Sequence, residues 1–403
     1  MHLFAYIVLG VAVFGTLTST ISFLLAVAGA IQFRRHALRE QEEVEKLTNL
    51  PPVTVLKPVH GKEVRLKESL ESFFRQDYPK FEVIFAADEA DDAALPVVRE
   101  VCAEFPNIPT RIMITGKPPW PNAQNYCYHK MTDVAAYDIL ITSDSDVEVA
   151  PNYLRDVIAP LLDPKNGAVT CVFRGKAAGG VWSEVDAIGQ SVEFTAGVVT
   201  ANMMEGMKFG LGPTVVVRKD SLAKIGGFAA AREYLSNDFV IGNFIAAAGY
   251  TVVLSGHVVD HISPPMTFKK MWERQMRWAM GTRYSRPKGH FGSGLTFATP
   301  FGILGLIAGI ALGYTKLGIA LFAITVLSRM IECWLLGWWT ARDKNARGIW
   351  VLVYPLRDLH GFIIWLASYL GTPKRLWRDT NYVLLKGGRL VAKRADGSVL
   401  TPN

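Results

Sequence analysis

Two aspartates one residue apart follow an apolar stretch near the middle of the chain. The stretch YDILITSDSDVEV, residues 137–149, has the pattern of a buried strand that ends at Asp144, Ser145 and Asp146. Side chains alternate along a strand, so Asp144 and Asp146 point to one side, where their charges repel each other. A divalent cation such as Mg²⁺ or Mn²⁺ prefers oxygen ligands and would relieve this repulsion. A solvated acidic turn is the simpler alternative.

A third acid, Asp238, stands directly before FVIGNFIAAAG, an apolar stretch that we expect to be a helix. A carboxylate in that place can act as a general base, which takes a proton from an attacking hydroxyl group. It can also be an acid in the first helical turn, stabilised by the helix dipole. The two roles are compatible, so the position alone leaves both open.

A basic and aromatic helix is predicted over residues 266–287, MTFKKMWERQMRWAMGTRYSRP. Arg274 and Arg277 lie three apart on one face, where the planar fork of arginine can bind a diphosphate. Trp272 and Trp278 lie among lysines and arginines, which is typical of a helix at the membrane surface. Both properties suit a protein whose soluble and lipid reactants must meet at a membrane.

Strands and helices are predicted to alternate through residues 51–290. PVTVLKPVHG is a strand that runs into a loop at 57–61, and FEVIFAADEADD is a strand that ends in acids from Asp88 onwards. This alternation predicts an α/β fold with a mostly parallel sheet. Ligands bind such sheets at the carboxyl ends of their strands, where we expect Asp88, Asp144 and Asp146 to converge.

The N-terminal part of the chain predicts a membrane anchor. No charged residue occurs in residues 3–33, and arginines follow at Arg34, Arg35 and Arg39. A bilayer-spanning helix needs roughly 20 apolar residues, and a signal peptide needs a basic residue ahead of its apolar run, which is missing here. The arginines place the segment that follows in the cytoplasm.

Three further apolar segments follow at 297–314, 317–339 and 349–370. The second contains Arg329 and Glu332, three apart on one face, which we expect to pair inside a helical bundle. The third has charged residues at its middle and either crosses the membrane or lies in its interface. The basic tail favours the cytoplasm, whereas three crossings would place it outside, and both alternatives stay open.

Composition excludes several other classes. Four cysteines are scattered without C-x-x-C spacing, so neither a zinc cluster nor a disulfide framework is predicted. His257 and His261 are four apart but lie in a β-rich stretch, which disfavours a helical zinc site. The net charge is +7, but the sequence has no basic run interleaved with aromatic residues. We therefore expect the basic residues to contact a membrane surface and phosphate ligands rather than nucleic acid.

These motifs in this order resemble family 2-type glycosyltransferases of the GT-A fold, and more narrowly the ceramide glucosyltransferase family and its bacterial relatives. The similar phrases extend from the first anchor to the tail: VLKPVHG (55–61), FRQDYP (74–79), DEADDAALPVV (88–98), VVRKDSLAKIGGF (216–228), SNDF (236–239) and WRDTNYVLLKGG (377–388). Asn237 stands where many relatives have an acid.

The resemblance implies a role for each motif. The nucleotide of a UDP-sugar would bind Lys57, Pro58 and Asp88, and its diphosphate would meet a Mg²⁺ or Mn²⁺ ion held by Asp144 and Asp146. Asp238 would be the general base of an inverting transfer. The remaining three residues would complete the donor and acceptor sites: Arg274 and Arg277 at the diphosphate, and Trp278 beside the acceptor.

The resemblance also leaves the substrates open. It implies transfer of one sugar, with UDP-glucose favoured, to the hydroxyl group of a membrane lipid such as ceramide. The alternative is a UDP-N-acetylglucosamine-dependent hopanoid glycosyltransferase. PPWPNAQNYCYHK (118–130) lacks the lysine and paired asparagines expected of ceramide enzymes, and SVEFTAGVVTANMM (191–204) lacks their histidine.

Two other kinds of protein are alternatives. A polymer synthase would need more membrane spans, and a non-catalytic membrane scaffold would tolerate loss of the acids, all of which are present. We therefore expect a multi-pass protein of a bacterial inner membrane with four parts. They are an anchor (1–35), a cytoplasmic GT-A catalytic domain (50–290), transmembrane or interfacial helices (294–372) and a basic tail (373–403).

Overall fold

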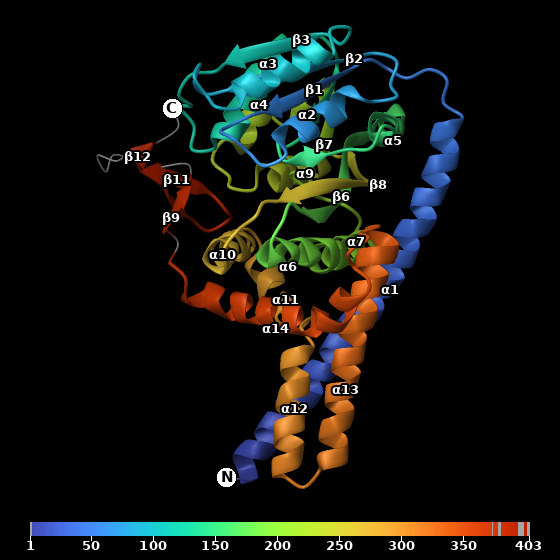
Figure 1. The fold of residues 1–403 in the computed structure, drawn as a ribbon, viewed down its shortest axis with the longest axis vertical. Helices are drawn as coiled ribbons and strands as arrows, with labels where there is room; N and C mark the ends of the chain where they lie inside the picture. The colour runs from blue at the N-terminus through green and yellow to red at the C-terminus, as the bar shows by residue number, and fades with distance from the viewer. Residues whose placement is uncertain (1, 373, 378–379, 394–398, 401–403) are drawn as a thin grey trace. The chain divides into compact units, whose positions relative to one another are not determined.

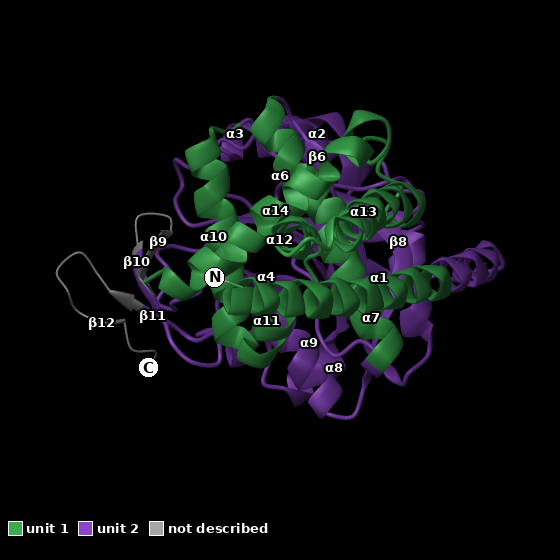
Figure 2. Cartoon of the chain, turned by 90° about the horizontal axis from the view of Figure 1, so that it is seen from below, with its two compact units in different colours: residues 1–33, 180–204, 266–372 green, residues 34–179, 205–265, 373–403 purple. Residues whose placement is uncertain are grey.

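The computed structural model describes residues 2–372, 374–377, 380–393 and 399–400. Within the basic tail, Arg378 and Arg394 lie outside these ranges. The chain divides into two compact units, coloured separately in Figure 2. The membrane unit comprises residues 1–33, 180–204 and 266–372, and the sheet unit comprises residues 34–179, 205–265 and 373–403. Each is described by itself.

The sheet unit is built on an eight-stranded sheet in the order β3-β2-β1-β4-β7-β6-β8-β5 (Figure 1). The neighbours β1–β2, β1–β4, β2–β3 and β6–β8 are parallel, whereas β7 is antiparallel to both β4 and β6, and β5 is antiparallel to β8. The predicted α/β fold with a mostly parallel sheet is therefore confirmed. The strands are β1 (Val53–Pro58), β2 (Phe81–Ala87), β3 (Thr110–Ile114), β4 (Ile139–Thr142), β5 (Val147–Glu148), β6 (Asn166–Ala177), β7 (Val215–Arg218) and β8 (Thr251–Ser263).

Helices join the parallel strands, as the alternating pattern predicts. Strands β1, β2 and β4 are buried along almost their whole length. Helix α2 (Leu66–Phe74) buries Leu66, Leu70 and Phe73, which are spaced along one helical face. The other helices and turns of the unit are α3 (Leu95–Glu104), α4 (Ala123–Val134), α5 (Tyr153–Ile158), η1 (Ala159–Leu162), α8 (Lys219–Lys224), η3 (Phe228–Ala231) and α9 (Asn237–Ala247).

The strand order brings distant segments to one edge of the sheet. Because β1, β2 and β4 are parallel, their carboxyl ends lie along the same edge. Strand β7 runs the other way, and its first residue, Val215, pairs with the last residue of β4, Thr142. The loop before β7 therefore reaches the edge where the loop after β4 begins.

A smaller sheet lies in the tail, in the order β12-β11-β10-β9. Strands β10 (Thr380–Leu384) and β11 (Leu390–Lys393) form an antiparallel hairpin in which Leu384 pairs with Leu390. Strands β9 (Lys374–Trp377) and β12 (Val399–Leu400) complete this sheet. The tail was predicted only as basic, so its strands are a finding of the structure.

Among the described residues, the membrane unit contains long apolar helices and one shorter apolar helix. Three are long and apolar enough to cross a bilayer: α1 (His2–Glu45), the segment Thr315–Thr340 formed by α13 (Thr315–Glu332) and η4 (Cys333–Thr340), and α14 (Ile349–Leu370). Helix α12 (Thr299–Ala311) is shorter, so the predicted span at 297–314 is helical over only part of its length. The remaining elements are α6 (Val181–Gly189), η2 (Gln190–Phe194), α7 (Thr195–Glu205), α10 (Phe268–Ser285) and α11 (Pro287–Ser293).

Helices α12 and α13 form an antiparallel pair, and the first part of α1 runs beside them (Figure 1). Leu9 of α1 packs on Ala308 and Leu321. Tyr6 lies near Tyr314 in the α12–α13 turn, with ring centroids 6.4 Å apart, so the start of α1 and this turn lie at the same end. Helix α14 instead runs across the α12–α13 pair at the opposite end (Figure 1).

Charged side chains are buried where these helices meet. Arg329 Nη1 lies 2.5 Å from Glu332 Oε2, which confirms the predicted pair, and 3.6 Å from Asp358 Oδ1. The other oxygen of Asp358 accepts hydrogen bonds from the backbone N–H groups of Ala298 and Thr299 at the start of α12. This network joins α12, α13 and α14 through paired charges.

Candidate functional site

Lys57 lies buried at the end of β1, beneath the two aspartates that follow β4. Its ammonium group donates a hydrogen bond to the backbone oxygen of Asp144 at 2.5 Å and lies 3.9 Å from the centre of the Phe73 ring. Burial lowers the pKa of Lys57 to about 7, although Asp144 and Asp146 oppose this change. The side chain therefore fixes the backbone of the acidic loop from below.

The carboxylate of Asp144 is held by helix α4. Gln124, in the first turn of that helix, donates from Nε2 to Asp144 Oδ1 at 2.5 Å and to the hydroxyl oxygen of Tyr128 at 3.2 Å. Burial and the neighbouring Asp146 raise the pKa of Asp144 to about 7. A carboxyl group in this position is costly to ionise alone, and a nearby cation would favour its charged form.

Asp146 lies beside His261, which the pairing of β5 with β8 brings to the site. His261 Nε2 is 3.3 Å from Asp146 Oδ2, and the backbone oxygen of Asp146 accepts a hydrogen bond from Ile262. The sequence disfavours His261 as half of a helical zinc pair, and the structure places it on a strand. Its position next to an acid of the D-x-D motif depends on strand pairing, which the sequence does not reveal.

The two acids fit a divalent cation as partial ligands. Among the residues that the structure describes, no three acidic, histidine or cysteine side chains form a complete metal cage. Mg²⁺ is commonly bound by one or two carboxylates together with water and substrate phosphates rather than by a cage of protein ligands alone. Asp144 and Asp146 supply two carboxylates of this type.

Asp238 occupies the first turn of α9, as the sequence predicts. Its carboxylate accepts hydrogen bonds from the backbone N–H groups of Gly212 and Phe239, while burial raises its pKa. Helix α9 lies very close to the loop before β7, because a Cβ atom on Gly210 would come within 2.7 Å of the backbone oxygen of Asp238. The loop and the helix thus fix the acid from two directions.

Gly212 lies between two of the predicted site residues. A Cβ atom on Gly212 would be 3.4 Å from Asp144 Oδ2 and 3.4 Å from Asp238 Oδ2. The two carboxylates therefore face the same small space, although 94 positions of sequence separate residues 144 and 238. Gly212 and Gln124 are site residues that sequence reasoning did not select. The phrase FGLGPT, 209–214, with two glycines before a strand, is the signal that could have indicated the first of them.

Asp88 follows β2 on the far side of β1 from β4. Thr115 Oγ1 and Cys127 Sγ each lie 3.4 Å from Asp88 Oδ1, so the acid is held at the edge predicted for the nucleotide. Pro58 ends β1 and pairs with Ala86. The loop after Pro58 is fixed by Asp92, which accepts hydrogen bonds from the backbone N–H groups of Gly61 and Ala94. These contacts fix the residues that follow β1 and β2 at the carboxyl end of the sheet, where the nucleotide is predicted to bind.

Arg274, Arg277 and Trp278 belong to α10 of the membrane unit. Arg274 Nε lies 3.4 Å from Asp186 Oδ2, and its guanidinium group lies 4.9 Å from the Trp278 ring centre. Gln275 donates to the other oxygen of Asp186 at 3.2 Å. Arg274 is thus anchored to α6, and the predicted roles of these three residues in donor and acceptor binding stay predictions.

Comparison with known proteins gives a match over most of the chain. The model of glycosyl transferase family 21 matches residues 17–390. Ceramide glucosyltransferase 1 of Caenorhabditis elegans is 24% identical over 376 residues, covering 91% of this chain and 79% of that protein. Ceramide glucosyltransferase 3 of the same organism is 22% identical over 394 residues, covering 92% and 80%.

A solved structure is also similar. It is a mannosyltransferase from Pyrobaculum calidifontis in complex with GDP-Man and Mn²⁺, with 18% sequence identity and a TM-score of 0.47. The match covers 88% of this chain and 99% of that one.

Proposed function

Because the chain belongs to glycosyltransferase family 21, we propose that it transfers one sugar from a UDP-sugar to the hydroxyl group of a membrane lipid. UDP-glucose is the favoured donor and ceramide the favoured acceptor, in line with the names of its relatives. One observation of the structure supports a catalytic protein over a scaffold. The carboxylates of Asp144 and Asp238 face one small space beside Gly212.

In the proposed reaction, Asp238 accepts the proton of the acceptor hydroxyl as its oxygen attacks the anomeric carbon of the sugar. The bond between that carbon and the diphosphate breaks on the opposite face, so the product has inverted configuration and UDP leaves. The N–H groups of Gly212 and Phe239 hold the carboxylate of Asp238 in position for this step. A base fixed in this way needs no rearrangement when the hydroxyl arrives.

Asp144 and Asp146 would hold Mg²⁺ or Mn²⁺, which stabilises the negative charge that develops on the leaving diphosphate. Gln124 and Lys57 keep the acidic loop in place, through the carboxylate and the backbone of Asp144 respectively. Asp88 would accept hydrogen bonds from the uracil or ribose. Arg274 and Arg277 would bind the diphosphate, and Trp278 would border the acceptor.

The direction of α14 supports one arrangement in the membrane. Helices α12 and α13 form a hairpin, so the chain enters and leaves this pair at the end where α14 lies. With α14 in the interface, the segments before α10 and after α14 are on one side of the bilayer. We place this side in the cytoplasm, because the tail after Leu370 is basic.

The test is UDP release by the purified protein in detergent with Mg²⁺ or Mn²⁺. Each of UDP-glucose and UDP-N-acetylglucosamine is combined with ceramide or a hopanoid alcohol, and the configuration of the product is determined by NMR. We expect release only when UDP-glucose and ceramide are both present. Release of UDP with UDP-N-acetylglucosamine and a hopanoid alcohol would show that these are the substrates, and the proposed class of reaction would stand.

Asp238→Asn is the matched variant for this assay, since it keeps the size of the side chain and removes the base. We expect it to bind UDP with the affinity of the wild type and to lose turnover by about 10²–10⁴-fold, the usual contribution of a general base. Retained turnover would exclude Asp238 as the base. Absence of both turnover and UDP binding in the wild type would instead favour the scaffold.

A further inference from the structure

The hairpin of the tail ends in a tight glycine turn. Gly387 and Gly388, between β10 and β11, have φ angles of +84° and +79°, which glycine adopts without strain. The turn is closed by hydrogen bonds from Leu385 N–H to the Arg389 oxygen and from Gly388 N–H to the Leu385 oxygen. The two leucines where the strands meet the turn, Leu384 and Leu390, are buried, each 3% exposed. The turn is therefore a defined element rather than a loose end of the chain.

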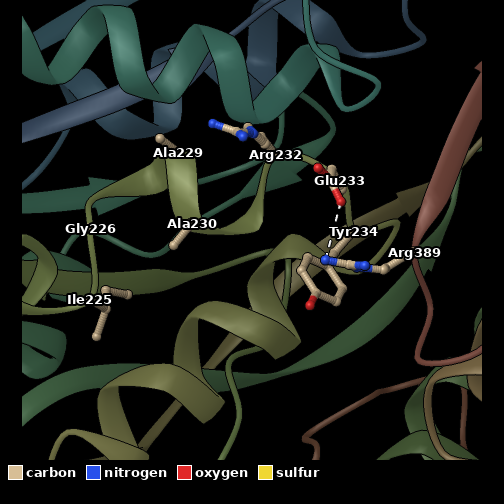
Figure 3. A pocket seen from close by; sticks show the side chains of 8 residues that line it. All are labelled: Ile225, Gly226, Ala229, Ala230, Arg232, Glu233, Tyr234 and Arg389. Atoms are coloured by element: carbon tan, nitrogen blue, oxygen red, sulfur yellow. Dashed lines mark ion pairs between the residues drawn. The ribbon is translucent and has the colours of Figure 1, made fainter. Parts of the chain in front are cut away.

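This turn pairs with the segment just before the proposed base. Leu390 N–H donates to the Glu233 backbone oxygen at 2.5 Å, and Leu235 N–H donates to the Gly388 oxygen at 3.1 Å. The guanidinium group of Arg389 lies 3.4 Å from the Glu233 carboxylate and 5.9 Å from the Tyr234 ring centre. Figure 3 shows Arg389 extending across the Tyr234 ring towards Glu233. Tyr234 and Arg389 thus form an isolated antiparallel β-bridge, which joins residues 233–235 to the hairpin.

The same segment is also held by Asn122, the residue that precedes α4. Asn122 is fully buried and donates from Nδ2 to the Tyr234 oxygen at 2.8 Å. Its backbone N–H donates to the Arg232 oxygen at 3.1 Å. An open pocket of about 390 Å³ lies between η3 and Arg389, so side chains pack around the segment only in part (Figure 3). Hydrogen bonds from the hairpin and from Asn122 therefore provide much of its restraint.

The segment leads directly to the base. Leu235 is followed by Ser236, the residue that precedes α9, and Asp238 lies in the first turn of that helix. Only Ser236 lies between Leu235 and the first residue of α9, Asn237, so little chain is available to absorb a displacement of the segment. A shift at Leu235 is thus passed to the carboxylate that Gly212 and Phe239 hold.

We propose that the β10–β11 hairpin positions the general base, with Arg389 as the positioning residue that fixes residues 233–235 ahead of Asp238. The proposal rests on the function proposed above for Asp238. The hairpin then acts on the catalytic step, so loss of its contact with residues 233–235 lowers the rate of transfer and leaves the binding of the donor unchanged.

Arg389→Glu tests this, because it places a second carboxylate beside Glu233 and repels the segment. We expect kcat to fall by about 3- to 30-fold with the KM for the UDP-sugar unchanged, since small misplacements of a catalytic group lower the rate. The double variant Glu233→Arg/Arg389→Glu restores the ion pair and should recover most of the loss. Lys386→Glu is the control, because Lys386 is exposed in the same turn and the substitution changes the charge by the same amount as Arg389→Glu.

Hydrogen–deuterium exchange of residues 234–240 gives a readout that does not depend on activity. We expect faster exchange in Arg389→Glu and wild-type exchange in the double variant and in Lys386→Glu. Unchanged kcat or unchanged exchange in Arg389→Glu would overturn the proposal. So would an equal loss in the Lys386→Glu control, or failure of the charge exchange to restore the wild-type behaviour. A wild type without transferase activity would refute the proposed function instead, and the exchange data would still decide whether the hairpin restrains the segment.

Discussion

Gly242 allows α9 to lie directly on the loop that holds Gly212, and we expect this close approach to set the position of Asp238. A Cβ atom at Gly242 would lie 2.6 Å from the Phe209 Cα and would also meet the backbone of Gly210. Ordinary contacts of a Cβ atom begin at 3.4 Å. The variant Gly242→Ala must therefore separate the helix from the loop by at least the difference, about 0.8 Å, and by more at the backbone of Gly210.

A separation of this size moves the proposed base relative to the N–H group of Gly212 that holds it. Misplacement of a reacting group by about 1 Å can lower a rate by about 10²-fold. We therefore expect kcat of Gly242→Ala to fall by about 10- to 100-fold. Overpacking of this kind also costs about 1–3 kcal/mol of stability, so the protein should remain folded at room temperature.

The assay measures kcat and KM by UDP release in detergent, together with UDP affinity and the thermal unfolding temperature. Gly197→Ala is the control, because a Cβ atom there meets nothing within 4 Å in α7. It should leave kcat unchanged and add up to about 1 kcal/mol of stability, as alanine favours a helix over glycine.

Two results would refute this reasoning. A folded Gly242→Ala protein with the kcat of the wild type would show that the close approach does not set the base. Equal losses of kcat and UDP affinity would show a general distortion of the edge instead of a displaced base.

Three further predictions concern the proposed base, the space beside it and the membrane unit. Gly212→Ala adds a methyl group at ordinary contact distance from Asp144 and Asp238, so we expect wild-type thermal stability. The methyl group occupies the space between the two carboxylates, so kcat should fall at least tenfold. A variant with the kcat of the wild type would show that the substrates do not use this space. Because burial raises the pKa of Asp238 and only its carboxylate form accepts a proton, kcat should decline, as the pH falls, at a higher pH than for an ordinary aspartate. A pH profile of kcat that stays level until an ordinary aspartate titrates would contradict this. Arg329→Met leaves the buried Glu332 and Asp358 without their cation, which should lower the free energy of unfolding by about 3–5 kcal/mol and the unfolding temperature in detergent. The double variant Arg329→Met/Glu332→Met should recover part of this stability. An unchanged unfolding temperature in the single variant would show that the ion pair is not needed.

The parts of the site that the sequence predicts are those set by local pattern. Strands β1, β2 and β4 are short apolar runs, and the residues that follow them, such as Asp88 and Asp144, were placed correctly at the edge of a parallel sheet. The first turn of α9 was likewise predicted from an acid before an apolar stretch. In each case the determining residues are within a few positions of one another.

The parts that the sequence does not predict depend on pairing between distant segments. Gln124 reaches Asp144 from α4, His261 reaches Asp146 through the β5–β8 ladder, and Gly212 reaches Asp144 because β7 runs antiparallel to β4. Side-chain periodicity shows which face a residue occupies but does not show which strand lies beside it. The short helix α12 was also overestimated, since hydropathy does not mark where a helix ends in a turn.

The direction of α14 has a mechanical consequence for the bilayer. If α14 lies in the membrane interface, as proposed above, it takes up area in one leaflet only, whereas a spanning α12–α13 pair takes up area in both. The two leaflets around the protein are then unequally filled, and lateral pressure in the leaflet that holds α14 acts along its exposed apolar residues, among them Leu352, Leu356 and Ile363. In that arrangement, curvature and lipid packing in that leaflet would act directly on the helix.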